Sequence, residues 1–600
     1  MLIIGISIWL SACGDGSNER ADNGVANNPP VATDDSYDTF GNTLLEVGGV
    51  PSRGIAARVI GSVLDNDSDL DVGDTLTVSL DVGPVSGSLI INADGNFSYT
   101  PPVGQTAVTD TFSYRVSDGT ASALATVSIN ITRRIWYVDN RSAGGAGTSD
   151  APFAFLAAAA LIAEDGDVIY IANGDGSSTG LDTGLTLAVP NVSLIGEGIM
   201  LVFDRTTLAA AGLAPSITNK RGAGITLNAA DNTYVSGLII DGVTGDGLVI
   251  NDSAGVTLQN VTISNSGESA IQGGGADVQL SLINVDIDAV DRVDPLVSDD
   301  AIFIAATASS SLVMNGGSIN GVPGNLGDAI VFENADSANP VTMNLDIRGV
   351  SFSNIGQDGI KLDNENGILN AQIGSAIGTE GNMFDVGFRG IQIKTNADPS
   401  LSRINTILIQ NNAIISNAEG IQIRNIADTT NVSILDNMLM SATVANSSGL
   451  IDVQAELASN TQARINRNRV FNATGTDGIK LKVFDAATLI MEAKKNAIDG
   501  PVEGFDFEVI ETGAGAADTT LNASVLDNSL TNIGSESLNA RNANATSVTC
   551  LDLQGNSLVA DYVLDAVTGS FALTMASQTI VFGPPGGGVS GAGPCAVPTF

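Results

Sequence analysis

Six side chains that carry oxygen ligands crowd into ten residues near the start of the chain: Asp65, Asn66, Asp67, Asp69, Asp71 and Asp74. Oxygen atoms at this density suit a hard cation such as calcium, because crowded carboxylates repel one another unless a cation neutralises them. The spacing is not that of an EF-hand loop. The segment predicts a calcium site, and an acidic loop that is only solvated is the alternative.

A second chemical candidate is a group of basic residues in the second half of the chain. The chain has only 25 basic residues against 66 acidic ones, which gives a formal net charge of −41. Five basic residues and one aspartate nevertheless fall on one predicted face, namely Lys361, Asp363, Lys394, Arg424, Lys480 and Lys482, and Arg389 lies nearby. Extended acidic glycans could lie along such a strip. The alternative is a solvated face whose charges serve solubility.

An enzyme that cleaves uronate glycans would use some of the same residues. In a lyase, Lys361 or Lys394 would act as the base. Arg424 would bind a uronate carboxylate, and Asp363 would hold calcium. None of these residues forms a recognisable lyase signature, so a binding or structural role comes first and an enzyme second.

The chain has no histidine, and this absence excludes several mechanisms. A Ser/His/Asp triad, a Cys/His nucleophile pair and a zinc or iron site with histidine ligands are all ruled out. Any catalysis must rely on carboxylates, Lys, Arg or Tyr. The strongly acidic balance also disfavours nucleic acid and anionic membrane surfaces as partners.

A small residue followed by an aliphatic or aromatic one recurs along most of the chain. The pairs are Gly247-Leu248, Ala270-Ile271, Ala301-Ile302, Ala329-Ile330, Gly359-Ile360, Gly390-Ile391, Gly420-Ile421, Gly449-Leu450, Gly478-Ile479, Gly504-Phe505 and Ser537-Leu538. Ten steps cover 290 residues, a mean of 29. This period is typical of one solenoid coil built from three short strands.

An asparagine series runs out of phase with the first: Asn382, Asn412, Asn437, Asn468, Asn496, Asn528 and Asn556. One asparagine per coil is expected where a tight turn needs a left-handed backbone and stacked amides bond along the axis. Outward positions of five coils then give one column of Lys361, Gln392, Gln422, Asp452 and Lys480. Beside it runs a column of Asp363, Lys394, Arg424, Gln454 and Lys482, and the fourth coil needs a register shift of one residue.

These two series resemble the right-handed parallel β-helix of the pectate-lyase-like superfamily, from residue 134 to about 575. Ile135 to Asn140 would open the first coil, and a short helix in the alanine-rich stretch Ala151 to Ala163 would cap it. This superfamily contains polysaccharide lyases and hydrolases, so the resemblance implies such an enzyme as an alternative function. Asp299-Asp300 resembles the paired aspartates of polygalacturonases, but the other elements of that family are missing. Asp300 also shares its repeat position with Asp246, Asp328, Asp358 and Asp477, which favours a structural role.

Strands of period two precede the solenoid. Phe112, Tyr114 and Val116 alternate with polar residues, and turn signals at Asp94-Gly95 and Asp118-Gly119 separate the strands. The motifs that begin at Asp34, Val63, Asp94, Asp110 and Val116 resemble the bacterial cadherin-like or Ig-like family over residues 31–132. The fold class is therefore all-β, a parallel β-helix preceded by a small β-sandwich. The resemblance implies calcium at the acidic loop, with Asp34 and Asp35 as further contributors.

The apolar run Leu2 to Leu10 is too short to span a bilayer but fits a secretion signal. Leu10-Ser11-Ala12-Cys13 resembles a bacterial lipobox, so Cys13 is the predicted lipidation site, with a plain signal peptide as the alternative. Cys550 and Cys595 remain as a pair in an exported chain, which favours a disulfide over two free thiols.

The predicted organisation is a signal and lipobox at 1–13, a stalk at 14–30, the sandwich at 31–132, the β-helix at 133–575 and a C-terminal tail with the disulfide at 576–600. These features predict a lipid-anchored protein of the bacterial surface, held to the membrane only through its lipid. It would present a rigid β-helix for adhesion to another surface or for polysaccharide binding. A polysaccharide-active enzyme and a passive filament component are the alternatives.

Overall fold

The computed structural model describes most of the chain. The described residues are 26–49, 55–288, 300–321, 327–334, 341–376, 381–396, 403–442, 449–471, 475–510, 519–543, 548–557, 562–566, 570–575, 580–582 and 589–591. Cys13 and Cys595 lie outside them, so the predicted lipidation and disulfide stay predictions. Cys550 is buried in strand β47 (Val548–Gln554).

The N-terminal part is a β-sandwich, as predicted. One sheet has the order β4 (Thr77–Val82), β7 (Val108–Ser117), β8 (Ser122–Val138) and β1 (Asp35–Gly41). The other has the order β3 (Ala56–Val59), β2 (Leu44–Val47), β6 (Phe97–Thr100) and β5 (Ser88–Ile91). Aromatic side chains at alternate positions, among them Tyr99, Phe112 and Tyr114, fill the space between the sheets.

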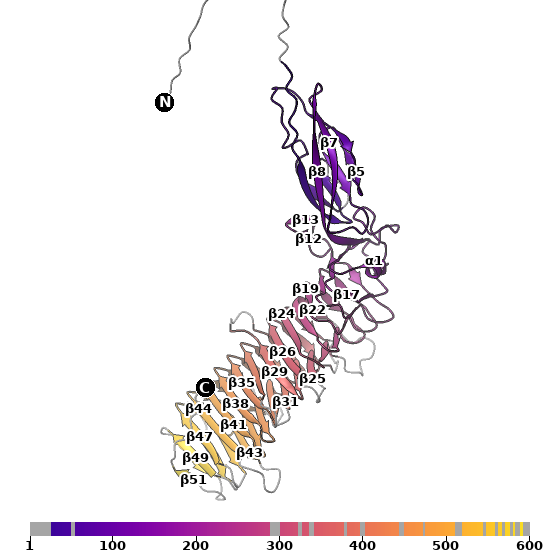
Figure 1. The fold of residues 1–600 in the computed structure, drawn as a ribbon. Helices are drawn as coiled ribbons and strands as arrows, with labels where there is room; N and C mark the ends of the chain where they lie inside the picture. Colours follow the sequence, from indigo (N-terminus) through magenta and orange to yellow (C-terminus); the bar gives the residue numbers. More distant parts are fainter. Residues whose placement is uncertain are drawn as a thin grey trace, which may run out of the picture.

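The C-terminal part is a parallel β-helix of stacked coils (Figure 1). One of its faces is a sheet that comprises, among the described residues, fifteen strands that pair in parallel, coil after coil. We call it the first sheet. Its strands are β10 (Leu185–Leu187), β15 (Ile225–Asn228), β18 (Leu248–Asn251), β21 (Ile271–Gly274), β23 (Ile302–Ala305), β25 (Ile330–Asn334), β28 (Ile360–Asn364), β31 (Ile391–Asn396), β34 (Ile421–Ile426), β37 (Gly449–Glu456), β40 (Asp477–Phe484), β43 (Phe505–Ile510), β46 (Leu538–Asn542), β48 (Tyr562–Ala566) and β50 (Ile580–Phe582).

The second sheet follows the first in each coil. Its central strands are β24 (Ser310–Asn320), β26 (Val341–Arg348), β29 (Gly367–Ile373), β32 (Ile404–Gln410), β35 (Thr429–Leu435) and β38 (Asn460–Asn466). Short strands such as β30 (Met383–Val386) and β33 (Ala413–Ser416) form the third face. Strands β50 and β51 (Val589–Gly591) pair with β48 and β49 (Ser570–Met575), so the stack extends past the predicted end at residue 575.

The small-aliphatic series aligns in a column inside the first sheet. Register pairs join Ile360 to Ile391 and Ile391 to Ile421, and these isoleucines are fully buried. The predicted shift in the fourth coil is present: Gly449 pairs with Asp477, whereas Ile451 pairs with Ile479. The residue of that coil that aligns with the column is therefore Ile451, one position after the predicted Leu450, and both side chains are buried.

The asparagine series forms a buried ladder. Asn437 donates from Nδ2 to Oδ1 of Asn468 at 3.0 Å and to the carbonyl of Ile409 at 2.9 Å. The same pattern runs through all seven residues, from Asn382 to Asn556. The left-handed backbone lies one position earlier than predicted: Asp436 (φ 58°) and Arg467 (φ 59°) make the turn, which leaves the following asparagine side chain aimed inward.

Strand β8 joins the two parts without a break. Its first ten residues pair with β7, and Ile135–Val138 pair with β9 (Val168–Ile171) of the first coil. Trp136 and Val138 pack into the β-helix core, whereas Ile135 and Tyr137 pack into the sandwich core. The predicted boundary at residues 132 and 133 therefore falls inside one strand that is buried on both sides at its end.

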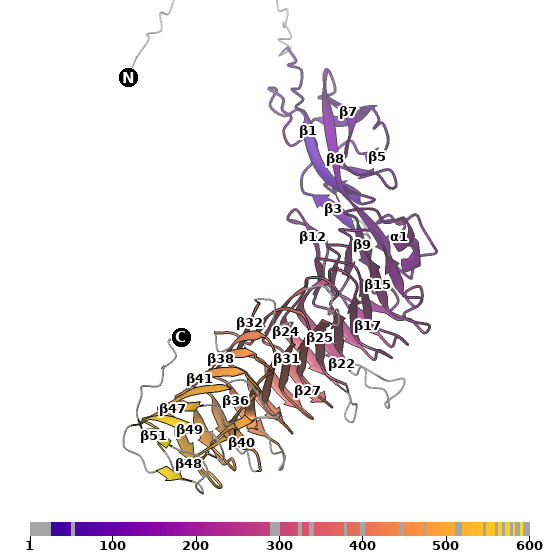
Figure 2. The same ribbon diagram turned by 60° about the horizontal axis from the view of Figure 1, so that its bottom comes forward.

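The predicted capping helix is α1 (Leu156–Ile162), which packs Leu156 and Ala159 onto the open end of the β-helix core. Figure 2 shows the β-helix leaving the sandwich at an angle, so the molecule as a whole is bent. No helix among the described residues has the length and apolar character needed to cross a bilayer.

Candidate functional site

The outer face of the first sheet carries the predicted charged columns in the predicted register. Lys361 pairs with Gln392, and Gln392 with Gln422; Asp363 pairs with Lys394, and Lys394 with Arg424. The next pairs bring Asp452 beside Lys480 and Gln454 beside Lys482. Parallel strands lie about 4.8 Å apart, so each column is a row of side chains one strand spacing from the next. We call these two columns the charged strip.

Carboxylates accompany most of the basic residues in this strip. The Nζ of Lys361 lies 3.3 Å from Oδ2 of Asp328, and the Nζ of Lys394 lies 3.2 Å from Oδ2 of Asp363. Arg424 forms two hydrogen bonds with Glu456, at 2.6 and 3.0 Å. The strip is therefore not the open cationic track that the sequence suggested, because acidic residues of the strip itself and of neighbouring columns pair with its basic residues.

Arg389 is held in the same way at the edge of the strip. Its guanidinium lies 3.1 Å from a carboxylate oxygen of Glu419 and 3.5 Å from one of Asp358, both of which are buried. Burial and the charge of Asp328 raise the pKa of Asp358 to about 6, against the opposing effect of Arg389. An anionic ligand would have to break these pairs before it could use their cations.

The weak lyase candidates are poorly placed to remove a proton. Burial alone would lower the pKa of Lys361, but the charge and hydrogen bond of Asp328 outweigh it, and the pKa is raised. The hydrogen bonds with Glu456 raise the pKa of Arg424. The carboxylate of Asp363 forms an ion pair with Lys394. A base with a raised pKa is protonated at neutral pH, which does not favour the lyase role.

Asp300 and its repeat equivalents have the structural role that the sequence favoured. The carboxylate of Asp300 accepts a hydrogen bond at 2.8 Å from the backbone N–H of Asp328 in the next coil. Asp328 does the same for Asp358, and Asp358 for Arg389. These carboxylates bind adjacent coils together along one edge of the first sheet.

The strip ends in a buried cluster of charges around Lys480. Its ammonium lies 3.2 Å from Asp477 and also pairs closely with Asp506, while its side chain is only 7% exposed. Burial alone would lower the pKa of Lys480, but the hydrogen bond and charge of Asp506 raise it. Lys480 is therefore the internal counterion of this cluster.

The same cluster holds two carboxyl groups with strongly raised pKa values. Burial, followed by the charges of Asp506 and Asp477, raises the pKa of Glu503 to about 7. Burial raises the pKa of Asp452, which is 1% exposed, to about 6. One oxygen of each group is buried and makes no hydrogen bond. Sequence reasoning placed Lys480 and Lys482 here but missed Glu503 and Asp506, because neither belongs to a recognised motif.

The acidic residues of the sandwich separate into different environments. Carboxylate oxygens of Asp69, Asp74 and Asp118 lie within 4.8 Å of one another, and we call these three residues the acidic triad. Asp118 was not predicted, since it follows strand β7 far along the chain. Oδ2 of Asp69 is buried without a hydrogen bond, and desolvation and the charges of Asp69 and Asp71 raise the pKa of Asp74.

The other predicted calcium ligands lie elsewhere. Asp67 accepts a hydrogen bond from the hydroxyl of Tyr114, which also donates to Asp35 at 2.9 Å. Asn66 donates to the carbonyl of Asp34. Burial raises the pKa of Asp35 to about 6.

Two further predicted ligands already have partners. Asp71 binds the backbone and side chain of Asn28, and Asp65 accepts a hydrogen bond from Ser62. The predicted six-residue site is therefore divided, and only Asp69 and Asp74 belong to the acidic triad.

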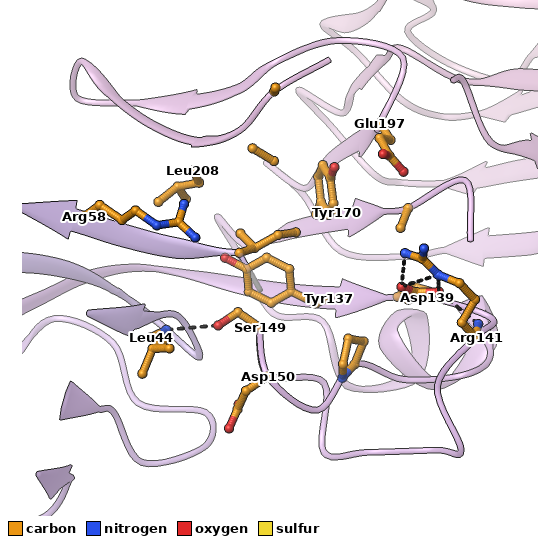
Figure 3. Close-up of a pocket in the computed structure, with 16 residues that line it drawn as sticks. Leu44, Arg58, Tyr137, Asp139, Arg141, Ser149, Asp150, Tyr170, Glu197 and Leu208 are labelled. Atoms are coloured by element: carbon orange, nitrogen blue, oxygen red, sulfur yellow. Dashed lines mark hydrogen bonds and ion pairs between the residues drawn. The ribbon is translucent and has the colours of Figure 1, made fainter. Parts of the chain in front are cut away.

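A cavity of about 670 Å³ lies where the sandwich meets the first coils. Figure 3 shows Arg58 at one end and the ion pair of Asp139 and Arg141 at the other, with Tyr137 and Tyr170 between them. The pair is close, at 2.7 Å, and Arg58 lies 3.3 Å from Glu46. Because its charged groups already have partners, the cavity does not specify a ligand by charge.

Residues 27–133 match the family model of the bacterial cadherin-like domain. This match confirms the predicted family of the sandwich and agrees closely with its predicted limits of 31–132. Cadherin-like domains are typically found outside the cell or at its surface. No curated protein matches the chain. The family of the β-helix therefore stays at the level of its fold, a stack of parallel strands.

Proposed function

We propose that this chain is an extracellular scaffold that holds a β-helix in a fixed orientation for adhesion or polysaccharide contact. The observation that carries the proposal is strand β8, which belongs to both parts and is buried on both sides at its end. A scaffold of this kind needs stiffness at the point where an anchor module meets a presenting module. Lipidation at Cys13 would tether it to the outer membrane or cell surface.

The junction contains polar contacts that oppose rotation of the two parts. The guanidinium of Arg134, from β8, binds Asp167 at 2.9 Å and Glu164 at 2.6 Å. The indole of Trp136 donates to the same carboxylate of Asp167 at 2.9 Å. A buried arginine with two planar contacts fixes both distance and orientation, which supports a rigid joint.

Small-angle X-ray scattering tests the rigid joint. The wild-type protein is expected to fit one bent shape with a single longest dimension. A variant with a glycine-serine insertion after Thr132 interrupts β8 and is expected to require an ensemble of orientations. The same insertion in the surface turn at Asp118-Gly119 serves as the control. A wild-type scattering curve that itself requires many orientations would contradict the proposal.

Calcium binding at the acidic triad is a second part of this proposal. Asp69 and Asp74 on one loop and Asp118 on another would hold the ion, and its charge would relieve the repulsion among them. The orphaned oxygen of Asp69 suits such a ligand. Because calcium would bind only the folded sandwich, saturation at a hundred times Kd is expected to stabilise it by about 2.7 kcal/mol.

Calorimetry with calcium and with a chelator tests this site. The transition in which the sandwich unfolds should move to higher temperature with calcium. D69N/D74N should abolish that shift, whereas D65N, in the same segment but outside the triad, should keep it. A transition that calcium leaves unchanged removes the ion from the proposal.

A glycan-hydrolysing activity is the second candidate function, and the cluster around Lys480 is what favours it. Asp477, Glu503 and Asp506 offer carboxylate oxygens within 4.8 Å of one another, and the pKa of Glu503 near 7 lies well above that of an ordinary carboxyl group. Pairs of carboxyl groups with different protonation states are the acid and base of glycosidases. Incubation with neutral and uronate polysaccharides, with E503Q as the control, tests it. Absence of new reducing ends across the panel would contradict it.

A further inference from the structure

The outer face of the second sheet carries a polar feature that lies outside all the sites described above. Side chains from five consecutive coils align there in one exposed column, and none of them is charged. They are Asn344, Asn370, Thr406, Asn431 and Gln462, on strands β26, β29, β32, β35 and β38. Figure 1 shows these strands stacked along one flank of the β-helix. We call this row the amide column.

A shallow hollow follows the first half of this column. It has a volume of about 390 Å³ and is lined by Asn344, Asn370 and Thr406 of the amide column and by the neighbouring outward column of Val313, Asp346, Gln372 and Leu408. Val313 is 38% exposed. The hollow therefore combines two partly exposed apolar side chains with several hydrogen-bonding groups, a combination typical of ligand sites.

The amides of the column retain hydrogen-bonding capacity. Asn370 donates from Nδ2 to Oδ1 of Asn344 at 3.0 Å, and no other hydrogen bond of either side chain occurs within the described part of the chain. An amide both donates and accepts, as a sugar hydroxyl does. The amides of the column can therefore bind hydroxyl groups of a ligand while the hydrogen bond between Asn370 and Asn344 remains.

The charge around the column selects against an ionic ligand. Asp346, a charged residue that lines the hollow, already binds Arg348 through two hydrogen bonds at 2.6 and 2.7 Å. The chain as a whole carries a net charge of −41, which repels polyanions over distances up to the Debye length of the solution. By contrast, the charged strip on the first sheet contains an ionic side chain in almost every coil.

We propose that the hollow and the amide column bind an extended, uncharged β-linked glycan that runs along the β-helix axis. The column repeats once per strand spacing, about 4.8 Å, which is close to the length of one hexose ring in an extended chain. A surface with a translational repeat is matched best by a polymer with a similar repeat. Each coil then offers one hydrogen-bonding side chain to one sugar. This inference specifies the ligand class of the proposed extracellular scaffold and rests on that function for the ligand's location.

Isothermal titration with cellohexaose, with xylohexaose and mannohexaose alongside it, tests the inference. The wild-type protein is expected to bind at least one of these neutral hexasaccharides, and more tightly than the corresponding trisaccharide, because the column spans five coils. Binding should change little with salt. Hexagalacturonate, which is anionic, should bind at least tenfold more weakly.

Paired substitutions locate the binding. N344A/N370A removes one amide pair from the hollow and is expected to weaken the hexasaccharide about tenfold. N228A/N251A removes an equivalent exposed pair, 2.9 Å apart, from the first sheet and should leave binding unchanged. Unchanged circular dichroism in both variants shows that they are folded.

Several results would overturn the inference. They are no binding of any neutral hexasaccharide, binding that N344A/N370A does not weaken, and tighter binding of hexagalacturonate. None of them bears on the rigid joint, which the scattering experiment decides separately. A flexible joint together with glycan binding that N344A/N370A weakens would instead contradict the scaffold and keep the site.

Discussion

The sandwich and the β-helix both stack β-strands, yet they treat polar groups in opposite ways. The sandwich fills its interior with aromatic rings, such as Phe97 and Phe112 at 5.4 Å, and keeps most of its carboxylates in surface loops. The β-helix fills its interior with aliphatic side chains and also buries a full ladder of asparagines. A loop of the sandwich can bond to water, whereas a coil that turns inside a continuous wall needs an internal partner for its backbone.

Breaking the joint between the two regions is expected to have the largest effect. R134A removes a guanidinium that is 8% exposed and leaves Asp167 buried without its cation. We expect a loss of about 3–5 kcal/mol, with the sandwich and the β-helix melting in two separate transitions. Differential scanning calorimetry measures this. R115A, which breaks the more exposed pair with Asp81, is the control. An unaltered melting profile for R134A would show that the ion pair does not couple the parts.

Breaking the ladder should destabilise the β-helix alone. N468A removes the donors to Ile434 and Asn496 and the acceptor that serves Asn437, all of them buried. We expect the free energy of unfolding to fall by about 2–4 kcal/mol, because the hydrogen-bonding groups that lose their partner remain buried away from water. N460A changes an exposed asparagine on strand β38, which precedes Asn468 in the same coil, and should alter the free energy of unfolding by less than about 0.5 kcal/mol. Urea titration followed by circular dichroism compares the two, and equal losses would mean that the ladder is not special.

In the buried cluster around Lys480, by contrast, we expect a substitution to stabilise the protein. The folded-state pKa of Asp452 is about 6, above its unfolded value, so its contribution to stability is full below about pH 4 and is lost as the pH rises through 6. D452N cannot ionise. It is expected to be more stable than the wild type by up to about 3 kcal/mol at pH 8 and equal to it near pH 4.

Thermal melts of both proteins between pH 4 and pH 8 measure this difference. D436N changes an aspartate in an exposed ion pair with Arg467, and the difference between its stability and that of the wild type should not grow in this way with pH. Wild-type and D452N curves that stay parallel over the whole range would disprove the role of Asp452.

The smallest effect is expected on the charged strip. The side chain of Arg424 is 47% exposed in its pair with Glu456. R424A should cost less than about 1 kcal/mol, since solvent and salt screen such pairs. The measurement is a urea titration at low and at high salt. A loss of stability comparable to that of N468A would show that the exposed strip stabilises the protein as much as the buried asparagine ladder does, which would contradict the expected difference.

The repeats could be predicted from the sequence because the same residue types recur once in each coil. Glycine before an isoleucine and one asparagine per coil are visible without coordinates, and the register of Lys361, Gln392 and Gln422 follows from them. The turn-forming residue was misplaced by one position, because Asp436 and Arg467 vary in type while the asparagine after them does not.

The partners of the predicted site could not be read from the same series. Glu456 meets Arg424 and Asp328 meets Lys361 from other columns of neighbouring coils, and nothing in the spacing of one column reports on another. The acidic triad was missed for a related reason, because Asp118 joins Asp69 and Asp74 only through the fold of the sandwich. The continuity of β8 was hidden because both of its halves alternate as ordinary strands do.

Strand β8 also has a mechanical consequence. Because the β-helix leaves the sandwich at an angle, a sideways pull at its far tip acts on a lever arm and produces a torque at the elbow. The four register pairs between β8 and β9 and the clamp around Arg134 must bear that torque. Under shear flow or traction this torque grows with the length of the β-helix, and the core that β8 and β9 share with the sandwich resists it together with those contacts.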